Sequence, residues 1–221
     1  MDTVIKFESP ASCIVAGASS SGKTSFIFEL LKNDKFMFKQ IPRKIIYCYS
    51  TYQPLYDDMK KQVENIEFFE GLPGKNDIDM WAVEPALKNL IIDDLAQKAS
   101  ESIEICNTFT IYSHHHNFSV FFIVQNLFTG GKYFRTISLN SHYFVLFNNQ
   151  RDQLQIQTLA KQMFPGESNY FMDAYTKAVQ KKYGYLLVDI SPHSNPLYKL
   201  RTNIFPSETL IVFRPEKETY E

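Results

Sequence analysis

The stretch that decides the fold runs from position 17 to position 24 and reads Gly17-Ala18-Ser19-Ser20-Ser21-Gly22-Lys23-Thr24. It matches the phosphate-binding pattern G-x-x-x-x-G-K-[ST] at every position. An apolar, strand-like run precedes it at residues 12–17, and apolar residues with helical spacing follow it at residues 23–32. Strand, loop and helix in this order are the context that the pattern requires, so the sequence predicts a phosphate-binding loop.

The chemistry of such a loop depends on backbone N–H groups that point toward one place, reinforced by the N-terminus of the following helix. Glycine at positions 17 and 22 is expected to allow special dihedrals and close approach to phosphate oxygens. Lys23 would reach the β- and γ-phosphates, and the Thr24 hydroxyl would ligate Mg²⁺. The predicted cofactors are therefore ATP and Mg²⁺. The predicted ATP-binding residues form one continuous segment: Gly17, Ala18, Ser19, Ser20, Ser21, Gly22, Lys23, Thr24 and Ser25.

A second motif is the apolar run Asn89-Leu90-Ile91-Ile92-Asp93-Asp94. A parallel strand delivers its C-terminal residues to the sheet edge where a phosphate loop lies. Asp93 would hold Mg²⁺, directly or through water, and Asp94 would polarise the attacking water. Gln125 ends another apolar strand, and its amide is placed to sense the γ-phosphate and orient that water. This requires the Gln125 strand to lie between the second motif and the phosphate loop.

Apolar runs alternate with helical spacing along the chain, which is typical of a parallel sheet covered by helices. Strands are expected at residues 12–17, 44–49, 66–69, 90–94, 120–125, 142–147, 185–190 and 210–213, and helices at residues 23–32, 55–63, 101–113, 153–163 and 169–181. No Pro/Gly/Ser-rich linker divides the chain. We therefore expect one α/β domain over residues 1–221, a P-loop NTPase of ASCE/RecA-like type with a mostly parallel central sheet and helices on both faces. We expect residues 1–10 to form an N-terminal extension, and residues 191–221 to form a C-terminal extension packed on or beside the domain.

Composition limits the classes of function. The 23 Lys+Arg and 24 Asp+Glu residues leave a formal net charge of −1, which excludes a histone-like nucleic-acid coat. Contact with DNA would then need a local patch or an assembly that repeats modest basic loops. The loops at residues 71–75 and 130–132 are candidates for that contact. A hydrophobic share of 44% excludes a disordered chain.

Cysteine, histidine and hydropathy patterns add further limits. Cys13, Cys48 and Cys106 form no CxxC pair, so neither a zinc ribbon nor a disulfide framework is expected, and buried free thiols indicate a reducing compartment. The run His114-His115-His116 is expected to be solvated or helix-capping, because three consecutive imidazoles cannot all face one ion. Residues 1–8 do not resemble a signal peptide. A membrane span needs about 18–20 apolar residues in a row, and no stretch of the sequence approaches that length. We expect a protein that is neither secreted nor membrane-spanning.

Taken together, the phosphate loop, the Asp-Asp motif and the strand ending in Gln resemble the FtsK–HerA superfamily of pumping ATPases. The likeness narrows in four stretches: FSVFFIVQNLF at 118–128, GKYFRTISLN at 131–140, FNNQRD at 147–152 and LAKQM at 159–163. These are similar to the genome-packaging ATPases of Polinton/Maverick elements and related small DNA viruses, including adintovirus-like viruses and virophages. The resemblance runs from about Cys13 to Pro165, which is most of the chain.

The resemblance implies a homo-oligomeric ring, expected to be a hexamer, that drives double-stranded DNA into a preformed capsid and meets a capsid vertex or portal-like protein. It implies the roles given above for Lys23, Thr24, Asp93, Asp94 and Gln125. Asp94 departs from the Glu that the superfamily often uses, although packaging relatives do use an Asp-Asp pair. The chain is too short for an added nuclease domain, so no DNA cleavage is expected. The implied location is the host nucleus or a cytoplasmic virus factory, with association to the virion as a further option.

Ring ATPases often complete the active site with an arginine from a neighbouring subunit. Arg135, after a glycine-containing loop, is the first candidate, and Arg151 is the alternative. Two other classes of function stay open. A nucleoside or nucleotide kinase has a similar size and the same loop, but the chain lacks an arginine-rich lid. A non-catalytic nucleotide-binding assembly protein is disfavoured by the positions of Asp94 and Gln125.

Overall fold

The computed structural model describes residues 5–128, 130–151 and 153–215, so Thr129, Asp152 and the outer parts of both predicted extensions lie outside the described residues. Within these residues, nine strands form one sheet in the order β3-β2-β4-β5-β1-β6-β7-β8-β9. The strands are β1 (Ser12–Ala16), β2 (Lys44–Tyr49), β3 (Ile66–Glu70), β4 (Lys88–Asp93), β5 (Phe118–Val124), β6 (Tyr143–Phe147), β7 (Tyr185–Asp189), β8 (Leu200–Thr202) and β9 (Ile211–Phe213).

Helices connect the strands and cover the sheet. They are α1 (Lys23–Lys32), α2 (Asp34–Met37), α3 (Leu55–Gln62), α4 (Lys75–Ala82), α5 (Ala96–Glu101), α6 (Ile103–Asn107), α7 (Ser113–His115), α8 (Phe134–Leu139), α9 (Gln153–Met163) and α10 (Ser168–Ala178). A π-helical turn, η1 (Thr108–Tyr112), joins α6 to α7, and a 3₁₀ turn, η2 (Pro196–Tyr198), precedes β8.

The centre of the sheet is parallel, as the continuously apolar strands predict. Strand β5 pairs in parallel with β1 on one side and β4 on the other, and every residue of these three strands is buried. A strand that is buried on both faces cannot alternate polar and apolar residues, which explains runs such as residues 118–124. The antiparallel pairs are confined to one side of the sheet, where β7, β8 and β9 follow β6.

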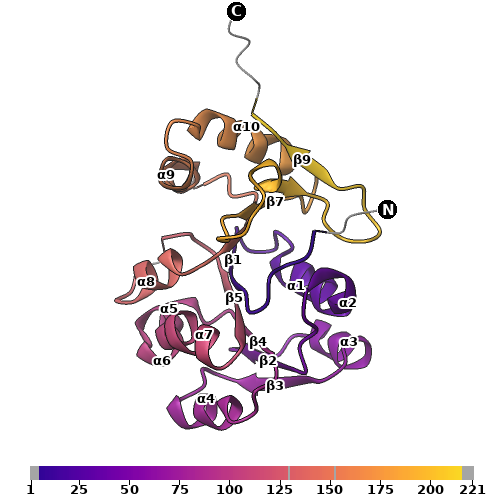
Figure 1. The fold of residues 1–221 in the computed structure, drawn as a ribbon, viewed down its shortest axis with the longest axis vertical. Coiled ribbons are helices and arrows are strands. Elements are labelled where there is room, and N and C mark those ends of the chain that lie inside the picture. Colours follow the sequence, from indigo (N-terminus) through magenta and orange to yellow (C-terminus); the bar gives the residue numbers. More distant parts are fainter. Residues whose placement is uncertain (1–4, 129, 152, 216–221) are drawn as a thin grey trace, which may run out of the picture.

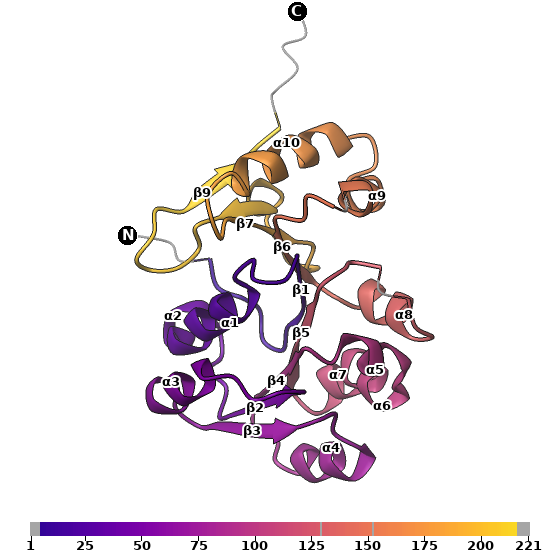
Figure 2. The same cartoon turned by 180° about the vertical axis from the view of Figure 1, so that it is seen from behind.

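The two faces of the sheet carry separate cores. Helices α1 to α3 pack on one face and α4 to α10 on the other (Figures 1 and 2). Successive residues of β1 alternate between the cores: Cys13 and Val15 pack beneath α1, whereas Ile14 and Ala16 face the other helices. This alternation is the period of two that an extended strand imposes. The predicted α/β fold with helices on both faces is confirmed.

Several expected elements differ from the observed ones, and two of these differences have clear local causes. A single helix over residues 101–113 was expected, but Ser102 is extended and its hydroxyl accepts a hydrogen bond from the Ile105 N–H, so one helix ends and α6 begins there. Serine often caps helix N-termini in this way. The apolar residues keep helical spacing across this position, so the sequence pattern alone predicts one continuous helix. Helix α4 was not expected at all. It begins at Lys75, because the Asp77 carboxylate accepts a hydrogen bond of 2.8 Å from the Gly74 N–H.

The predicted C-terminal extension contributes two strands to the sheet. Arg201 on β8 and Asp189 on β7 form an ion pair of 3.1 Å, with only 1% and 6% of the two side chains exposed. Asp189 also accepts hydrogen bonds from the backbone and side chain of Ser191. A charge buried this deeply must keep its partner, so the pair holds β8 against β7.

We predict that Asp189→Asn lowers the free energy of unfolding by about 3–5 kcal/mol, because Arg201 then stays buried without a counter-charge. Urea denaturation measures this change. The matched control is Asp173→Asn, which breaks an ion pair with Lys177 whose side chains are 60% and 59% exposed. Its expected cost is below about 1 kcal/mol. Equal effects of the two substitutions would contradict a role for the buried pair.

Candidate nucleotide-binding site

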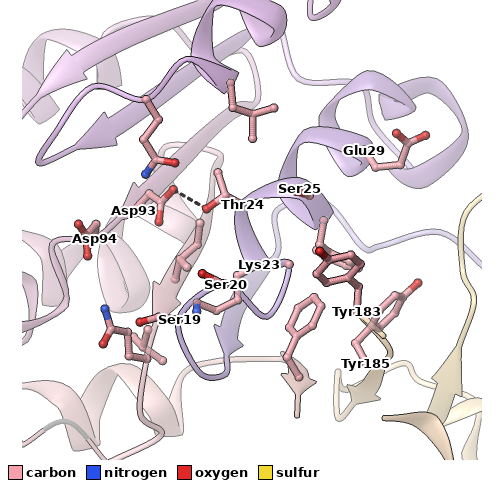
Figure 3. Close-up of a pocket in the computed structure, with 18 of the residues that line it drawn as sticks. Ser19, Ser20, Lys23, Thr24, Ser25, Glu29, Asp93, Asp94, Tyr183 and Tyr185 are labelled. Carbon is pink, nitrogen blue, oxygen red and sulfur yellow. Dashed lines mark hydrogen bonds between the residues drawn. The ribbon is translucent and has the colours of Figure 1, made fainter. Parts of the chain in front are cut away.

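A cleft of about 1230 Å³ opens where the parallel strands end, at the edge of the sheet that carries the phosphate loop. It brings together the loop, the second motif and the end of the Gln125 strand. The predicted site residues that line it are Ser19, Ser20, Gly22, Lys23, Thr24, Ser25, Asp93, Asp94 and Gln125. Figure 3 shows Lys23 and Thr24 in the middle of this cleft, with Asp93 and Asp94 on one side.

The two glycines of the loop serve different purposes. Gly22 has a φ of +106°, a left-handed value that side chains rarely adopt, and its carbonyl accepts the first helical hydrogen bond of α1 from the Phe26 N–H. Gly17 does not have a left-handed φ, contrary to expectation. It is required because a Cβ there would lie 2.5 Å from the Cβ of Phe147 on β6. Gly17, Ala18 and Ser21 are not among the described residues that line the cleft.

Lys23 extends back along the loop. Its Nζ donates hydrogen bonds of 2.8 Å to the Gly17 carbonyl and 2.7 Å to the Ala18 carbonyl. Burial lowers the pKa of Lys23, while the charges of Asp93 and Asp94 act in the opposite direction. The ammonium group is therefore pre-positioned along the loop, in a poorly hydrated place where an anion would interact with it strongly.

Asp93 is the best-anchored acid of the cleft. It is 4% exposed, and its Oδ2 accepts hydrogen bonds from the Thr24 hydroxyl at 3.1 Å and from the Tyr47 hydroxyl at 2.6 Å. Burial raises the pKa of Asp93, and these two hydrogen bonds act against that rise. An oxygen-only pair of a carboxylate and a hydroxyl beside a phosphate-binding loop suits Mg²⁺, which takes few protein ligands and completes its shell with phosphate and water.

Asp94 has a different environment. It is exposed, follows the last residue of β4 and has a φ of +56°. Aspartate tolerates this left-handed conformation better than most residues. Its Oδ2 accepts a hydrogen bond of 3.1 Å from the Ser50 hydroxyl, just beyond the end of β2. Asp93 thus faces the loop, whereas Asp94 presents a solvated carboxylate to the cleft.

Gln125 follows β5, and the strand order β4-β5-β1 places it between the acids and the loop. This confirms the predicted strand position. Gln125 and its neighbour Asn126 both line the cleft and are exposed.

The two candidate arginines are not brought into the cleft. Arg135 is exposed in the first turn of α8, and Arg151 is exposed just before α9. Neither is among the described residues that line the cleft. Among the described residues that line the cleft in one copy of the chain, the positively charged side chain is that of Lys23.

Further expectations concern metals, thiols and membranes. Two buried free thiols were expected, and in the described part of the chain Cys13, Cys48 and Cys106 are all free and buried. No group of three or more His, Cys, Asp or Glu side chains among the described residues is arranged to hold a metal ion. Across residues 5–128, 130–151 and 153–215, no helix combines the length and apolar character needed to cross a membrane.

Sequence reasoning missed several residues of the site. Tyr47 lies on β2 and Ser50 directly follows it, and the pairing of β2 with β4 sets Tyr49 beside Asp93. Their roles follow only once β2 is known to neighbour β4, which no local motif reveals. The opposite wall of the cleft, formed by Tyr183, Tyr185, Phe205 and Glu208, was also missed, because these residues come from the far end of the chain.

Three comparisons were made between this chain and known proteins. No protein-family model and no curated protein matches the sequence. Among solved structures, the chain is similar to the genome packaging NTPase B204 from Sulfolobus turreted icosahedral virus 2 in complex with ATPγS. The TM-score is 0.54 at 14% identity, over 93% of this chain and 98% of that one. A second match is the Legionella pneumophila ATPase DotB, with a TM-score of 0.38 at 14% identity over 81% of this chain and 55% of that one.

The likeness to B204 shows the fold. The chain has the fold of a P-loop NTPase, with a mostly parallel sheet and helices on both faces.

We predict that Tyr47→Phe lowers the free energy of unfolding by about 1.5–3 kcal/mol at neutral pH, because the buried Asp93 carboxylate loses a charge-assisted hydrogen bond. The pKa of Asp93 is raised, so the folded state takes up a proton before the unfolded state as pH falls. The Tyr47 hydrogen bond matters most to the ionised form. The difference between variant and parent should therefore narrow as pH falls from neutral through that raised pKa.

Urea denaturation at several pH values measures this difference, and Tyr112→Phe is the matched control. Tyr112 also donates a hydrogen bond from its hydroxyl to a carboxylate, at 2.5 Å from Asp79, but this contact is exposed and lies away from the cleft. Its loss should cost little at any pH. A pH-independent effect of Tyr47→Phe, or an equal effect of both variants, would show that the hydroxyl does not support Asp93.

Proposed function

We propose that the chain is an ATPase of the FtsK–HerA type that drives double-stranded DNA into a capsid of a virus or virus-like element. The observation that carries the hydrolytic part is the division of labour between Asp93 and Asp94. One acid is buried against Thr24, and the other is exposed in the same cleft. The likeness to a genome packaging NTPase supports the choice of process.

In this proposal, the loop N–H groups and Lys23 hold the β- and γ-phosphates. When bound, Mg²⁺ would be held by Thr24 and Asp93 and would offset phosphate charge. Asp94 orients the attacking water and accepts its proton as the water oxygen bonds to the γ-phosphorus. The bond from that phosphorus to the β–γ bridging oxygen breaks, and ADP and phosphate result. Gln125 lies at the end of the strand between Asp94 and the loop, where its amide can align the water.

The near-neutral charge bears on how DNA is held. A chain with a net charge of −1 has little general attraction for phosphate backbones, so an assembled ring that repeats exposed basic loops suits the task better than a single subunit. Lys132, in the loop at 130–132, is exposed and remains a candidate for the contact. The other candidate loop ends at Gly74, since Lys75 belongs to α4. The same proposal includes a ring of six subunits. It also includes a partner at the capsid, either a vertex protein or a portal-like protein.

The decisive experiment is steady-state ATP hydrolysis with and without linear double-stranded DNA of mixed sequence. We expect DNA to stimulate turnover and added salt to remove the stimulation, because phosphate contacts depend on counterion release. Asp94→Asn should lower kcat by about 100-fold or more while nucleotide binding persists. The control Asp58→Asn changes an exposed acid of α3 and should behave like the parent.

Other outcomes would contradict the proposal. Phosphoryl transfer to an added nucleoside or nucleotide, without DNA stimulation, would indicate a kinase. Nucleotide binding without turnover would indicate a non-catalytic assembly protein. Full activity of Asp94→Asn would remove that residue from catalysis.

We further predict that Arg135 acts on the nucleotide of a neighbouring subunit. It is exposed and outside its own cleft, as such a residue must be. Arg135→Ala should then lose on the order of 10³-fold in turnover, because charge on the transferring phosphoryl group is no longer offset. Lys23→Ala should be inactive for a different reason. Mixing the two inactive proteins should restore part of the activity at interfaces that pair an intact Lys23 with an intact Arg135.

Two further variants make this test specific. Arg151→Ala, mixed with Lys23→Ala in the same way, asks whether the alternative arginine acts in trans. Arg43→Ala removes an exposed arginine that directly precedes β2, at the end of that strand far from the cleft. This variant should leave turnover unchanged. Recovery with Arg151→Ala but not with Arg135→Ala would move the role to Arg151. Full activity of Arg135→Ala alone would exclude Arg135 from the site.

A further inference from the structure

The wall of the cleft opposite the acids is aromatic. Tyr183, Tyr185 and Phe205 line it together with Glu208 and with Phe26 of α1. Figure 3 shows Tyr183 and Tyr185 on the far side of Lys23 and Thr24 from Asp93 and Asp94. The cleft therefore has an acidic side and an aromatic side, with the phosphate loop between them.

This layout fixes the direction of a bound nucleotide, given the proposed function. The terminal phosphate must face Asp94, because that group acts on the attacking water. The triphosphate then lies along the loop past Lys23 and Thr24. The nucleoside must leave in the remaining direction, toward the aromatic side and Tyr183.

Tyr183 differs from its aromatic neighbours in exposure and in backbone. Its side chain is 57% exposed, whereas Tyr185 and Phe205 are 6% and 8% exposed. Its φ of +63° is left-handed, which is uncommon and strained for a bulky residue. It lies directly against the loop, since a Cβ on Gly22 would be 3.2 Å from the Tyr183 Cδ1. A strained turn thus holds a large exposed ring beside the start of α1.

The Lys182 Nζ lies 4.9 Å from the centre of that ring, and the neighbouring residues of the wall are tied to one another. The Tyr185 hydroxyl accepts a hydrogen bond of 3.0 Å from the Ile204 N–H, and the Phe205 ring packs 5.2 Å from that of Phe26. The turn from Phe205 to Glu208 is closed by a hydrogen bond of 2.9 Å from the Glu208 N–H to the Phe205 carbonyl. The C-terminal part of the chain is therefore fastened to α1 at the rim of the cleft.

We propose that Tyr183 is the platform on which the heteroaromatic base of the bound nucleoside triphosphate stacks, with the turn at Phe205–Glu208 as the rim of the base site. This inference rests on the proposed nucleotide function. Planar bases stack on exposed aromatic rings regardless of sequence, and each such contact contributes about 1–3 kcal/mol. A base site built from the turn before β7 and the turn between β8 and β9 also gives the C-terminal part of the chain a role in nucleotide binding.

Binding of two ligands separates this inference from the proposed function. Calorimetry would compare Mg²⁺-ATP with inorganic triphosphate, which keeps the phosphate chain but has no base. Tyr183→Asn removes the ring while suiting the left-handed φ, so the fold should persist. Tyr183→Phe keeps the ring. Tyr52→Asn is the matched control, because Tyr52 is 42% exposed and is not among the described residues lining the cleft.

We expect Tyr183→Asn to weaken ATP binding by about 5- to 100-fold and to leave triphosphate binding unchanged, as loss of one stacking contact implies. Tyr183→Phe and Tyr52→Asn should bind both ligands like the parent. The inference is overturned if Tyr183→Asn binds ATP like the parent, or if it loses both ligands equally. If the parent itself binds neither ligand, the proposed nucleotide function fails with it.

Discussion

A carboxylate buried where three elements meet is the constraint on which the site depends. Asp93 ends β4, and its Oδ2 is held by Tyr47 of β2 and by Thr24 of α1. An acid this deep is tolerated only when its oxygens accept hydrogen bonds. Those bonds fix the start of α1, and hence the phosphate loop, relative to β4. The position of the loop is therefore set by a polar contact across the sheet edge as well as by the pairing of β1.

The elements that follow from local pattern could be predicted from the sequence. Helix α1 and strand β2 have the bounds that the sequence predicts, because apolar spacing and β-branched residues decide them. Contacts between distant segments could not be predicted. The need for Gly17 comes from Phe147, and the support of Asp93 comes from Tyr47. Both depend on strand order, which a single sequence does not state.

The aromatic wall shows the same limit more strongly. Nothing near Tyr183 in the sequence indicates a binding role, since a tyrosine between a helix and a strand is ordinary. Its position beside Gly22 arises because β7 pairs antiparallel with β6, which in turn lies next to β1. The sheet thus brings the end of the chain to the loop near its beginning. A prediction that treats residues 191–221 as an extension also misses Phe205 and Glu208 of the same wall.

Assembly explains two features that are otherwise unconnected under the proposed function. The cleft of one copy is lined by residues of the loop and by Asp93, Asp94 and Gln125, yet both candidate arginines lie outside it. The chain as a whole is close to neutral, which is unsuited to holding DNA as a single subunit. The proposed ring would meet both needs, because a neighbour would supply an arginine and repetition would multiply a weak basic loop. Hydrolysis would then require the same contacts between subunits as DNA binding, so that ATP is consumed by the assembled motor and spared by the isolated chain.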